Sequence, residues 1–315
     1  MTRKLRIATR GSALALAQTG MIAAELTRLT GVEVTITVVT TEGDTSRASL
    51  ASIGGTGVFA SALRASLDEG GCDLVVHSLK DLPTAAYPGL VIGAVPLRED
   101  PRDALCSRDG LTLEELPEGS RVGTGSPRRV AQLLSLRPDL RVIDIRGNVD
   151  TRLAKVSSGE LDAVVLAAAG LTRLGRLDAV SEFFDLSVWP TAPGQGALAI
   201  EAREEDSIPE LNEIQHDGTR IGIGAERAVL AALEAGCSAP IGASSTLDGD
   251  TLTLNAVVYS ADGSAELGST RSVTLESPGD LAAREAAAVA LGSAVAAQLL
   301  SDGADELAEL GAGIR

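Results

Sequence analysis

Short apolar, β-branched runs alternate with longer segments of helical periodicity through the first two-thirds of the chain. One helix, from Ser12 to Thr30, has a clear end, because Gly31 stops it. Such alternation is typical of βαβ units, so the predicted fold class is α/β with mainly parallel sheets. The predicted strands are 5–9, 34–40, 73–77, 90–95, 121–123, 140–145 and 163–168. The predicted helices are 12–30, about 58–69, 127–136 and 150–157.

The last third of the chain follows a different pattern. A helix over 219–235 is followed by three alternating segments, which predict a small antiparallel sheet, and by a long Ala-rich helix over about 278–300. The three strands are 241–247, 251–259 and 269–275. These elements predict an α+β domain of roughly one hundred residues. The segment 191–196 is interpreted as a crossover between domains.

Composition adds limits to this picture. A length of 315 residues favours two or three domains. Hydrophobic residues make up 44% of the chain but aromatic residues only 2%, so Ala, Val, Leu and Ile must form the cores. No apolar run reaches the ~20 residues of a membrane span, and the segment 1–5 leads into a strand rather than a signal peptide. We therefore expect a cytoplasmic protein with no membrane partner.

Arginine recurs where a predicted strand runs into a helix, although the formal net charge is −16. With Ser126 as N-cap and Pro127 as the first helical residue, Arg128 and Arg129 fall in a first turn, where the helix dipole disfavours cations. Helix N-termini attract anions, and guanidinium groups bind carboxylates or phosphates in a bidentate manner. The pattern predicts an anion site. The net acidity argues against a nucleic-acid partner.

Further polar residues follow predicted strands. Lys80 and Asp81 come directly after a buried strand, as Arg10 and Arg146 follow theirs. Ligand crevices of parallel sheets lie at the carboxyl ends of the strands. Two interpretations of Lys80 and Asp81 stay open on spacing alone. They form either a solvated turn before Pro83 or a crevice in which a carboxylate donates a proton or stabilises a cation.

The three cysteines are widely spaced, which fits reduced thiols. Cys72 and Cys106 sit beside strand patterns and are predicted to be core residues. Cys237 lies in a Gly-Cys-Ser-Ala-Pro loop, where it is either simply exposed or a nucleophile or covalent anchor. With two histidines and no cysteine pair at ligand spacing, no metal site is expected. The glycine-rich stretch 54–57 lacks the lysine of a phosphate loop and is interpreted as a lid or connector.

Several ordered motifs resemble the porphobilinogen deaminase (hydroxymethylbilane synthase) family. They are the stretches 6–16, 76–83 (VHSLKDLP), 98–104, 123–129 (GTGSPRR), 146–153 (RGNVDTRL), 169–174, 194–197 and 236–242 (GCSAPIG). The resemblance implies two lobes like those of type II periplasmic binding proteins, with the active site between them, and a third α+β domain that carries the cofactor cysteine. The implied domains are 1–96 with 194–213, then 97–193, then 214–315.

The resemblance also implies an activity. The family is expected to join four porphobilinogen molecules, with loss of ammonia, on a dipyrromethane primer linked to Cys237, and to release hydroxymethylbilane by hydrolysis. This is a transferase reaction of porphyrin, tetrapyrrole and haem biosynthesis. A monomer is the family expectation, with uroporphyrinogen-III synthase as a candidate partner for hand-off of the product. The alternative is a two-lobed anion-binding or sensing module without catalysis.

Residue by residue, the motifs match the family's site. Asp81 matches the catalytic aspartate. The residues at cofactor-binding positions are Cys237, Lys80, Asp81, Thr124, Ser126, Arg128, Arg129, Arg146 and Gly147. The residues at substrate-binding positions are Arg10, Ser12, Arg146, Arg152, Arg173 and Gln195. One departure stands out: many members carry lysines in the glycine-rich stretch, where this chain has Ser52 and Thr56. A positively charged lid is therefore in doubt.

Overall fold

The computed structural model describes residues 4–39, 58–235, 239–276 and 278–308. The glycine-rich stretch with Ser52 and Thr56 and the loop cysteine Cys237 lie outside the described residues. The expectations that concern them therefore stay predictions.

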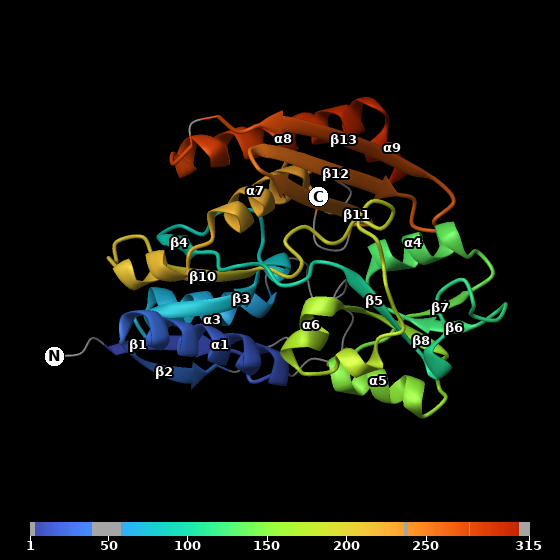
Figure 1. Ribbon diagram of the computed structural model, residues 1–315, viewed down its shortest axis with the longest axis horizontal. Coiled ribbons are helices and arrows are strands. Elements are labelled where there is room, and N and C mark those ends of the chain that lie inside the picture. The colour runs from blue at the N-terminus through green and yellow to red at the C-terminus, as the bar shows by residue number, and fades with distance from the viewer. Residues whose placement is uncertain (1–3, 40–57, 236–238, 277, 309–315) are drawn as a thin grey trace. The chain divides into compact units, whose positions relative to one another are not determined.

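The chain forms two compact units (Figure 1). The first comprises Met1–Glu99 and Ala197–Arg220, and the second comprises Asp100–Gly196 and Ile221–Arg315. Each unit contains an α/β sheet, and the second also contains the C-terminal module with its antiparallel sheet. The predicted α/β class with a C-terminal α+β module is confirmed. The division into three domains stays a prediction.

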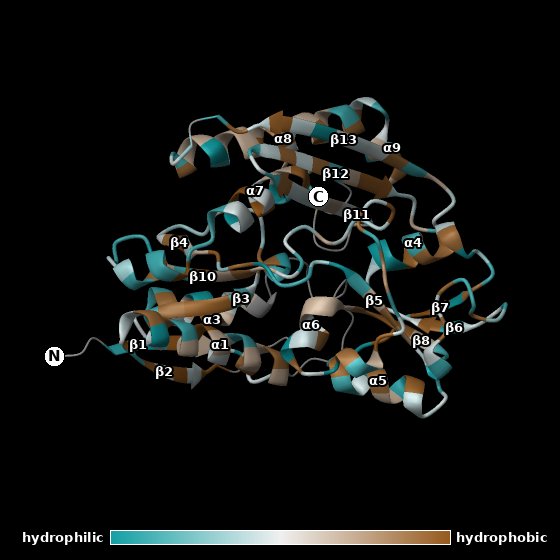
Figure 2. Ribbon diagram, in the orientation of Figure 1, coloured by the Kyte–Doolittle hydropathy of each residue, from teal (hydrophilic) through white to brown (hydrophobic). Residues whose placement is uncertain are grey.

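The first unit contains a five-stranded sheet in the order β2-β1-β3-β10-β4. Its strands are β1 (Lys4–Thr9), β2 (Glu33–Val38), β3 (Leu74–Ser78), β4 (Leu90–Ala94) and β10 (Leu198–Arg203). Strand β1 is parallel to β2 and β3, whereas β10 is antiparallel to β3 and β4. Buried on both faces, β3 is mostly brown in Figure 2. A three-residue 3₁₀ turn, η1 (Leu79–Asp81), follows it, and the 3₁₀ segment η4 (Pro209–Ile214) follows β10.

Two helices cover the two faces of this sheet. Helix α1 (Ala13–Thr30) begins at Ser12, whose Oγ accepts from the Ala15 N–H at 3.3 Å, and ends at Gly31 in the left-handed conformation. It packs on the face that contains Ile7, and α3 (Val58–Asp68) packs on the face that contains Ala8. Neighbouring residues of a strand point to opposite faces, so both faces are buried.

The second unit repeats this sheet order as β7-β6-β8-β5-β9. Its strands are β5 (Asp103–Ser107), β6 (Arg121–Gly123), β7 (Arg141–Ile143), β8 (Ala163–Ala167) and β9 (Glu182–Phe183). Its helices are α4 (Pro127–Leu136) on one face, α5 (Val149–Ser157) and α6 (Ala168–Arg173) on the other, with short 3₁₀ turns η2 (Arg108–Gly110) and η3 (Leu177–Ala179). Strands β6, β7 and β8 are parallel, and β5 is antiparallel to β8 and β9.

The antiparallel strands β5 and β10 were not predicted from the sequence. A buried apolar run has the same pattern in either direction, because only the tertiary connection sets the direction of the strand. The direction matters for the site. Since β5 runs opposite to β8, its first residue Asp103 pairs with Ala167, the last residue of β8, and so lies at the carboxyl edge of the parallel strands.

The C-terminal module packs a three-stranded antiparallel sheet against helices. It contains α7 (Asp217–Ala232), β11 (Ile241–Asp248), β12 (Thr251–Tyr259), β13 (Glu266–Thr274), α8 (Leu281–Ser301) and α9 (Ala304–Leu307). Helix α8 lies along the sheet in Figure 1, and Val229, Leu254 and Val295 meet in a core of their own. None of the helices in the described part of the chain has both the length and the apolar character to cross a membrane.

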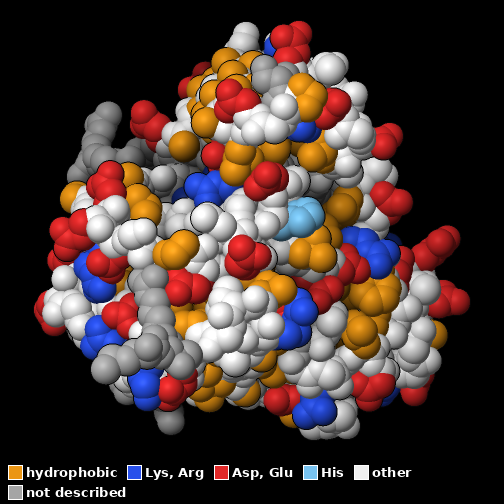
Figure 3. Space-filling view, turned by 60° about the vertical axis from the view of Figure 1, so that its left-hand side comes forward, with side chains coloured by type: hydrophobic (Ala, Val, Ile, Leu, Met, Phe, Trp, Pro, Cys, Tyr) orange, Lys and Arg blue, Asp and Glu red, His pale blue; other side chains and the backbone are white. Residues whose placement is uncertain are grey.

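The acidic balance of the chain is visible on its surface. On the face drawn in Figure 3, Asp and Glu side chains are scattered widely, and the Lys and Arg side chains lie among them in small groups. Cys72 and Cys106 are buried, as predicted for core residues.

Candidate functional site

In the first unit, Arg10, Ser12 and Asp81 line one pocket. Arg10 directly follows β1, and Asp81 ends the turn η1 that follows β3. Because β1 and β3 are parallel neighbours, their carboxyl ends lie at the same edge of the sheet. The pocket has a volume of about 70 Å³, enough to admit a small polar group. Asp81 is exposed there, and Lys80 beside it is half-buried.

The wall of this pocket contains a buried carboxylate system that was not predicted from the sequence. His77 lines the pocket, and its Nε2 lies 3.0 Å from Oε2 of Glu201 on β10. Glu201 also accepts from Nε and Nη2 of Arg64, at 2.9 and 2.7 Å. Burial would raise the pKa of the Glu201 carboxyl, but His77 and Arg64 lower it to about 2. A glutamate inside the apolar run of β10 is the sequence signal for this arrangement.

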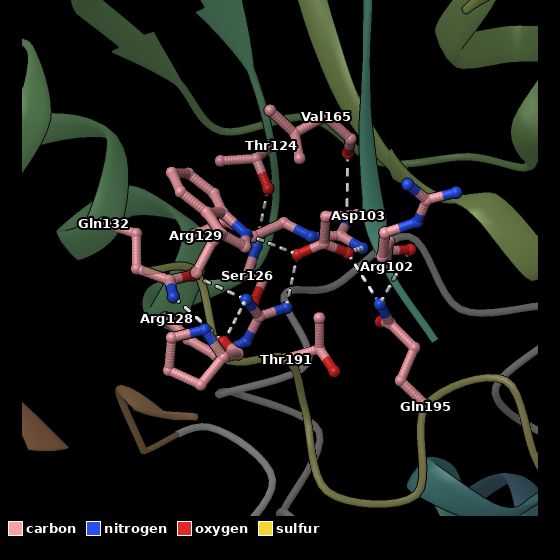
Figure 4. Close-up of polar contacts among 12 residues, drawn as sticks. Arg102, Asp103, Thr124, Ser126, Arg128, Arg129, Gln132, Val165, Thr191 and Gln195 are labelled. Carbon is pink, nitrogen blue, oxygen red and sulfur yellow. Dashed lines mark hydrogen bonds and ion pairs between the residues drawn. The ribbon is translucent and has the colours of Figure 1, made fainter. Parts of the chain in front are cut away.

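In the second unit, one buried carboxylate holds the arginine pair of α4. Asp103 is fully buried and accepts four hydrogen bonds (Figure 4). The donors are Nη2 of Arg128 at 2.8 Å, Nη2 of Arg129 at 2.6 Å, Nε1 of Trp189 at 2.9 Å and Nε2 of Gln195 at 2.7 Å. Burial alone would raise the pKa of Asp103, but the two guanidinium groups hold it far below its usual range.

The arginine pair therefore has an internal partner, which was not predicted from the sequence. Besides Asp103, Arg128 donates from Nη1 to Oε1 of Gln132 at 2.5 Å, and Arg129 donates from Nη1 to the Val165 carbonyl at 2.9 Å. The charge of Asp103, at the edge where β5 begins, therefore explains why two cations can lie in the first turn of α4. That they also bind cofactor carboxylates stays a prediction.

The start of α4 has the predicted cap residue, but that residue makes no capping hydrogen bond. Ser126 is the N-cap and Pro127 the first helical residue, yet the Ser126 side chain makes no capping hydrogen bond. Its backbone N–H donates instead to Oγ1 of the buried Thr124, at 3.3 Å. The Ser126 hydroxyl is thus not used to cap the helix.

Three arginines lie close enough to affect one another. The pKa of Arg152 is lowered to about 10, first by burial and then by the charges of Arg129 and Arg146, while Asp144 opposes the shift. Arg152 donates from Nε to the Gly147 carbonyl at 2.9 Å. We call Arg129, Arg146 and Arg152 the arginine cluster. Like charges held this close favour an added anion.

Two of the buried nitrogens in this cluster have no acceptor. Among the residues that the structure describes, Nε of Arg129 and Nε of Arg146 are buried without a hydrogen-bond partner, as is Nε of Arg128. A buried polar group without a partner is costly, and each such group calls for an explanation. A ligand with several carboxylates supplies acceptors of the required charge.

The remaining predicted residues hold the backbone near these arginines. Gly147 has a φ of 109°, and a Cβ there would crowd Thr151, so a glycine is required. Arg173 donates from Nη2 to the Gly196 carbonyl at 2.6 Å, and Gln195 donates to the Pro101 carbonyl at 2.8 Å. Both contacts fix the crossover segment 191–196. The predicted roles of Arg173 and Gln195 in substrate binding are not tested by these contacts.

Fold and site together define an α/β protein in which arginines gather at strand ends. Comparison with known proteins gives the family. The family description "Porphobilinogen deaminase, dipyromethane cofactor binding domain" matches residues 5–210, and "Porphobilinogen deaminase, C-terminal domain" matches residues 221–301. The chain belongs to the porphobilinogen deaminase family.

Individual relatives agree with this assignment. The chain is 58% identical to the porphobilinogen deaminase of Leifsonia xyli subsp. xyli, over 97% of this chain and 94% of the relative. It is 52% identical to that of Cutibacterium acnes, over 97% of each.

Among solved structures, the methionine binding protein MetQ has a TM-score of 0.44 and 11% identity, over 67% of this chain and 88% of MetQ. Immunogenic lipoprotein A of Vibrio vulnificus has a TM-score of 0.42 and 11% identity, over 68% and 96%.

Family membership confirms the function predicted from the motifs at the level of the family. The protein is a transferase of porphyrin and haem biosynthesis, and the matched first domain is the one that binds the dipyrromethane cofactor. The roles of individual residues are not settled by this match.

Asp103→Asn is expected to lower the free energy of unfolding by about 3–5 kcal/mol, because it leaves two guanidinium groups buried without their carboxylate. Urea unfolding followed by circular dichroism measures the loss. In the unmutated protein, the lowered pKa of Asp103 contributes to the free energy of unfolding. This contribution persists as the pH falls to about 4 and declines below that pH.

The control for this measurement is Asp150→Asn. Asp150 forms a half-exposed ion pair with Arg176, and such pairs contribute little. An Asp103→Asn variant as stable as the control would show that Asp103 does not offset the burial of the arginine pair.

Proposed function

We propose that this chain joins four porphobilinogen molecules into hydroxymethylbilane, with loss of ammonia at each condensation, on a dipyrromethane primer attached to Cys237. The observation that carries the proposal is the arginine cluster, whose charges and buried nitrogens fit a polycarboxylate. Family membership supports it. The assignment of Cys237 rests on the motif GCSAP, since that residue lies outside the described ones.

The residues of the second unit fit the primer and the growing chain. Each pyrrole ring carries an acetate and a propionate, so an oligopyrrole accumulates carboxylates as it grows. Arg146 and Arg152 would bind these carboxylates, with Arg129 and the Ser126 hydroxyl as further donors. Each charged hydrogen bond of this kind contributes roughly 1.5–3 kcal/mol. When bound, the dipyrromethane supplies the terminal pyrrole ring to which new units are joined.

Asp81 would act on the incoming porphobilinogen. In the protonated aminomethyl group the bond between carbon and nitrogen breaks, the nitrogen leaves as ammonia, and the positive charge remains on the substrate's methylene pyrrole. The exposed carboxylate of Asp81 would stabilise that charge, and Arg10 and Ser12 on the same pocket would hold a substrate carboxylate. A new carbon–carbon bond then forms, and the attacked ring carbon releases its proton.

The other predictions from the resemblance are kept as part of this proposal. They are hydrolytic release of hydroxymethylbilane, a monomeric state, a cytoplasmic location and hand-off to uroporphyrinogen-III synthase. A two-lobed sensing module without catalysis is not favoured, because the relatives that match over nearly the whole chain are deaminases.

The intact mass of the purified protein tests the proposal most directly. We expect a mass greater than that of the sequence by one dipyrromethane, and a colour with Ehrlich's reagent. Cys237→Ser should lose both, whereas Cys72→Ala, in which a buried cysteine is replaced, should keep them. Active protein with an unmodified Cys237 would contradict the assignment.

Asp81→Asn is expected to lower the rate of porphobilinogen consumption by about 10²–10⁴-fold while the primer stays attached, because the amide keeps the shape but not the charge of the group. Ammonia release gives the rate, and intact mass gives the primer. Asp109→Asn, at an exposed residue of the second unit, should leave both unchanged. Near-normal turnover of Asp81→Asn would remove Asp81 from the mechanism.

Arg146→Leu is expected to weaken binding of the growing chain by roughly 1.5–3 kcal/mol, seen as stalled intermediates in the mass spectrum. Without ligand, the same variant should be no less stable than the unmutated protein, because removing one cation relieves repulsion of Arg152. Arg176→Leu, which breaks only a half-exposed ion pair, serves as the control and should elongate normally. An unfolded Arg146→Leu protein would contradict a role in carboxylate binding.

A further inference from the structure

Helix α4 is joined to the C-terminal module by a buried hydrogen bond that the proposed chemistry does not use. Tyr259, the last residue of β12, is buried, and its hydroxyl accepts from Nε2 of Gln132 at 3.2 Å. Gln132 also accepts from Arg128 and donates to the Pro190 carbonyl at 2.9 Å. Burial raises the pKa of Tyr259 to about 12, so the hydroxyl stays neutral. A hydrogen-bonded path thus leads from the arginine pair into the C-terminal sheet.

Close backbone packing supports the same junction. Gly263, in the turn between β12 and β13, has a φ of 71°, and a Cβ there would overlap the carbonyl oxygen of Ala131 on α4. A Cβ at Gly242 on β11 would overlap the carbonyl oxygen of Pro190. The β12–β13 turn therefore meets α4, and strand β11 meets the segment at Pro190, at distances that only glycine permits.

The junction continues to the described end of the cofactor loop. The Tyr259 N–H donates to the Pro240 carbonyl at 3.0 Å, and Pro240 stands three positions after Cys237 in the sequence. On strand β11, which pairs with β12, the Ala243 N–H donates to the Thr191 carbonyl at 2.8 Å. The residue that bonds to α4 through its side chain thus holds the segment next to Cys237 through its backbone.

We propose that Gln132, Tyr259, Gly242 and Gly263, together called the α4 joint, fix Pro240, the described end of the loop that carries Cys237, relative to the arginines at the start of α4. The inference rests on the proposed function in one respect, namely that Cys237 carries the primer. Tyr259 and Gly263 are then positioning residues, because they act through the placement of other groups. Displacement of a reacting group by about 1 Å can cost about 10²-fold in rate, so an anchor must be held firmly.

The alternative is that the joint only stabilises the fold. A matched pair of glycine variants distinguishes this alternative from a positioning role. Gly263 and Gly249 lie in successive turns of the same sheet, with φ of 71° and 56°. Alanine imposes a similar backbone strain at both positions. Only at Gly263 does its Cβ meet α4, whereas at Gly249 no heavy atom lies within 4 Å. The difference between Gly263→Ala and Gly249→Ala isolates the joint.

The experiment follows primer attachment to full-length protein made without porphobilinogen. On addition of porphobilinogen, the thiol sulfur bonds to the methylene carbon of a first molecule, the carbon–nitrogen bond breaks, and ammonia leaves with the thiol proton. The methylene carbon of a second molecule then bonds to the free ring carbon of the first, and a second ammonia leaves with the proton of that ring carbon, which completes the dipyrromethane. Intact mass against time gives the rate. We expect Gly263→Ala to attach the primer at least about tenfold more slowly than Gly249→Ala, while urea unfolding shows both folded. Equal rates in the two variants would overturn the inference.

A second pair decides the matter if Gly263→Ala does not fold. Tyr259→Phe removes only the hydroxyl of the joint, and Tyr87→Phe removes the only other tyrosine hydroxyl of the chain, in the first unit. Slower primer attachment by Tyr259→Phe than by Tyr87→Phe supports the positioning role of the joint, and equal rates in the two variants overturn it. Failure of the unmutated protein to gain the primer mass contradicts the proposed function itself. That outcome differs from one in which the unmutated protein gains the primer mass but the two variants of a matched pair react at equal rates, which overturns only the inference about the joint.

Discussion

The site in the second unit depends on the burial of one carboxylate. Removing a charge from water costs several kcal/mol unless partners compensate, and Asp103 is compensated by donors from α4, Trp189 and Gln195. Those bonds fix the guanidinium groups of α4 against the helix dipole, which would otherwise disfavour them. Because Asp103 begins an antiparallel strand, the direction of β5 determines where the arginines of α4 are held.

The first unit uses a similar arrangement on the corresponding strand. Glu201 on β10 is buried and paired with Arg64 from α3, as Asp103 on β5 is paired with arginines from α4. In both units an acid on the antiparallel strand meets guanidinium from a covering helix. The positions differ, however. Asp103 lies at the edge beside the arginine cluster, whereas Glu201 lies within its strand, behind the pocket that Asp81 lines.

Local pattern was sufficient for much of the fold and for part of the site. Caps and periodicity predicted α1 and α4, and the rule for parallel strand ends brought Arg10 and Asp81 to one pocket. The pairing of Asp103 could not be predicted, because nothing local distinguishes a buried antiparallel strand from a parallel one. Nor does spacing show that Arg152 and Arg129 lie close together, since the folded chain alone creates that proximity.

If the arginine cluster binds the primer as proposed, it would also affect how long a molecule of this protein survives. A chain without bound carboxylates would keep its cations in mutual repulsion, so it would open more often, and opened chains are removed by proteases. A bound anion shifts the folding equilibrium toward the native state by mass action. The cell would therefore retain the molecules that have acquired their primer and degrade those that have not, a form of quality control that needs no separate factor to recognise the cofactor.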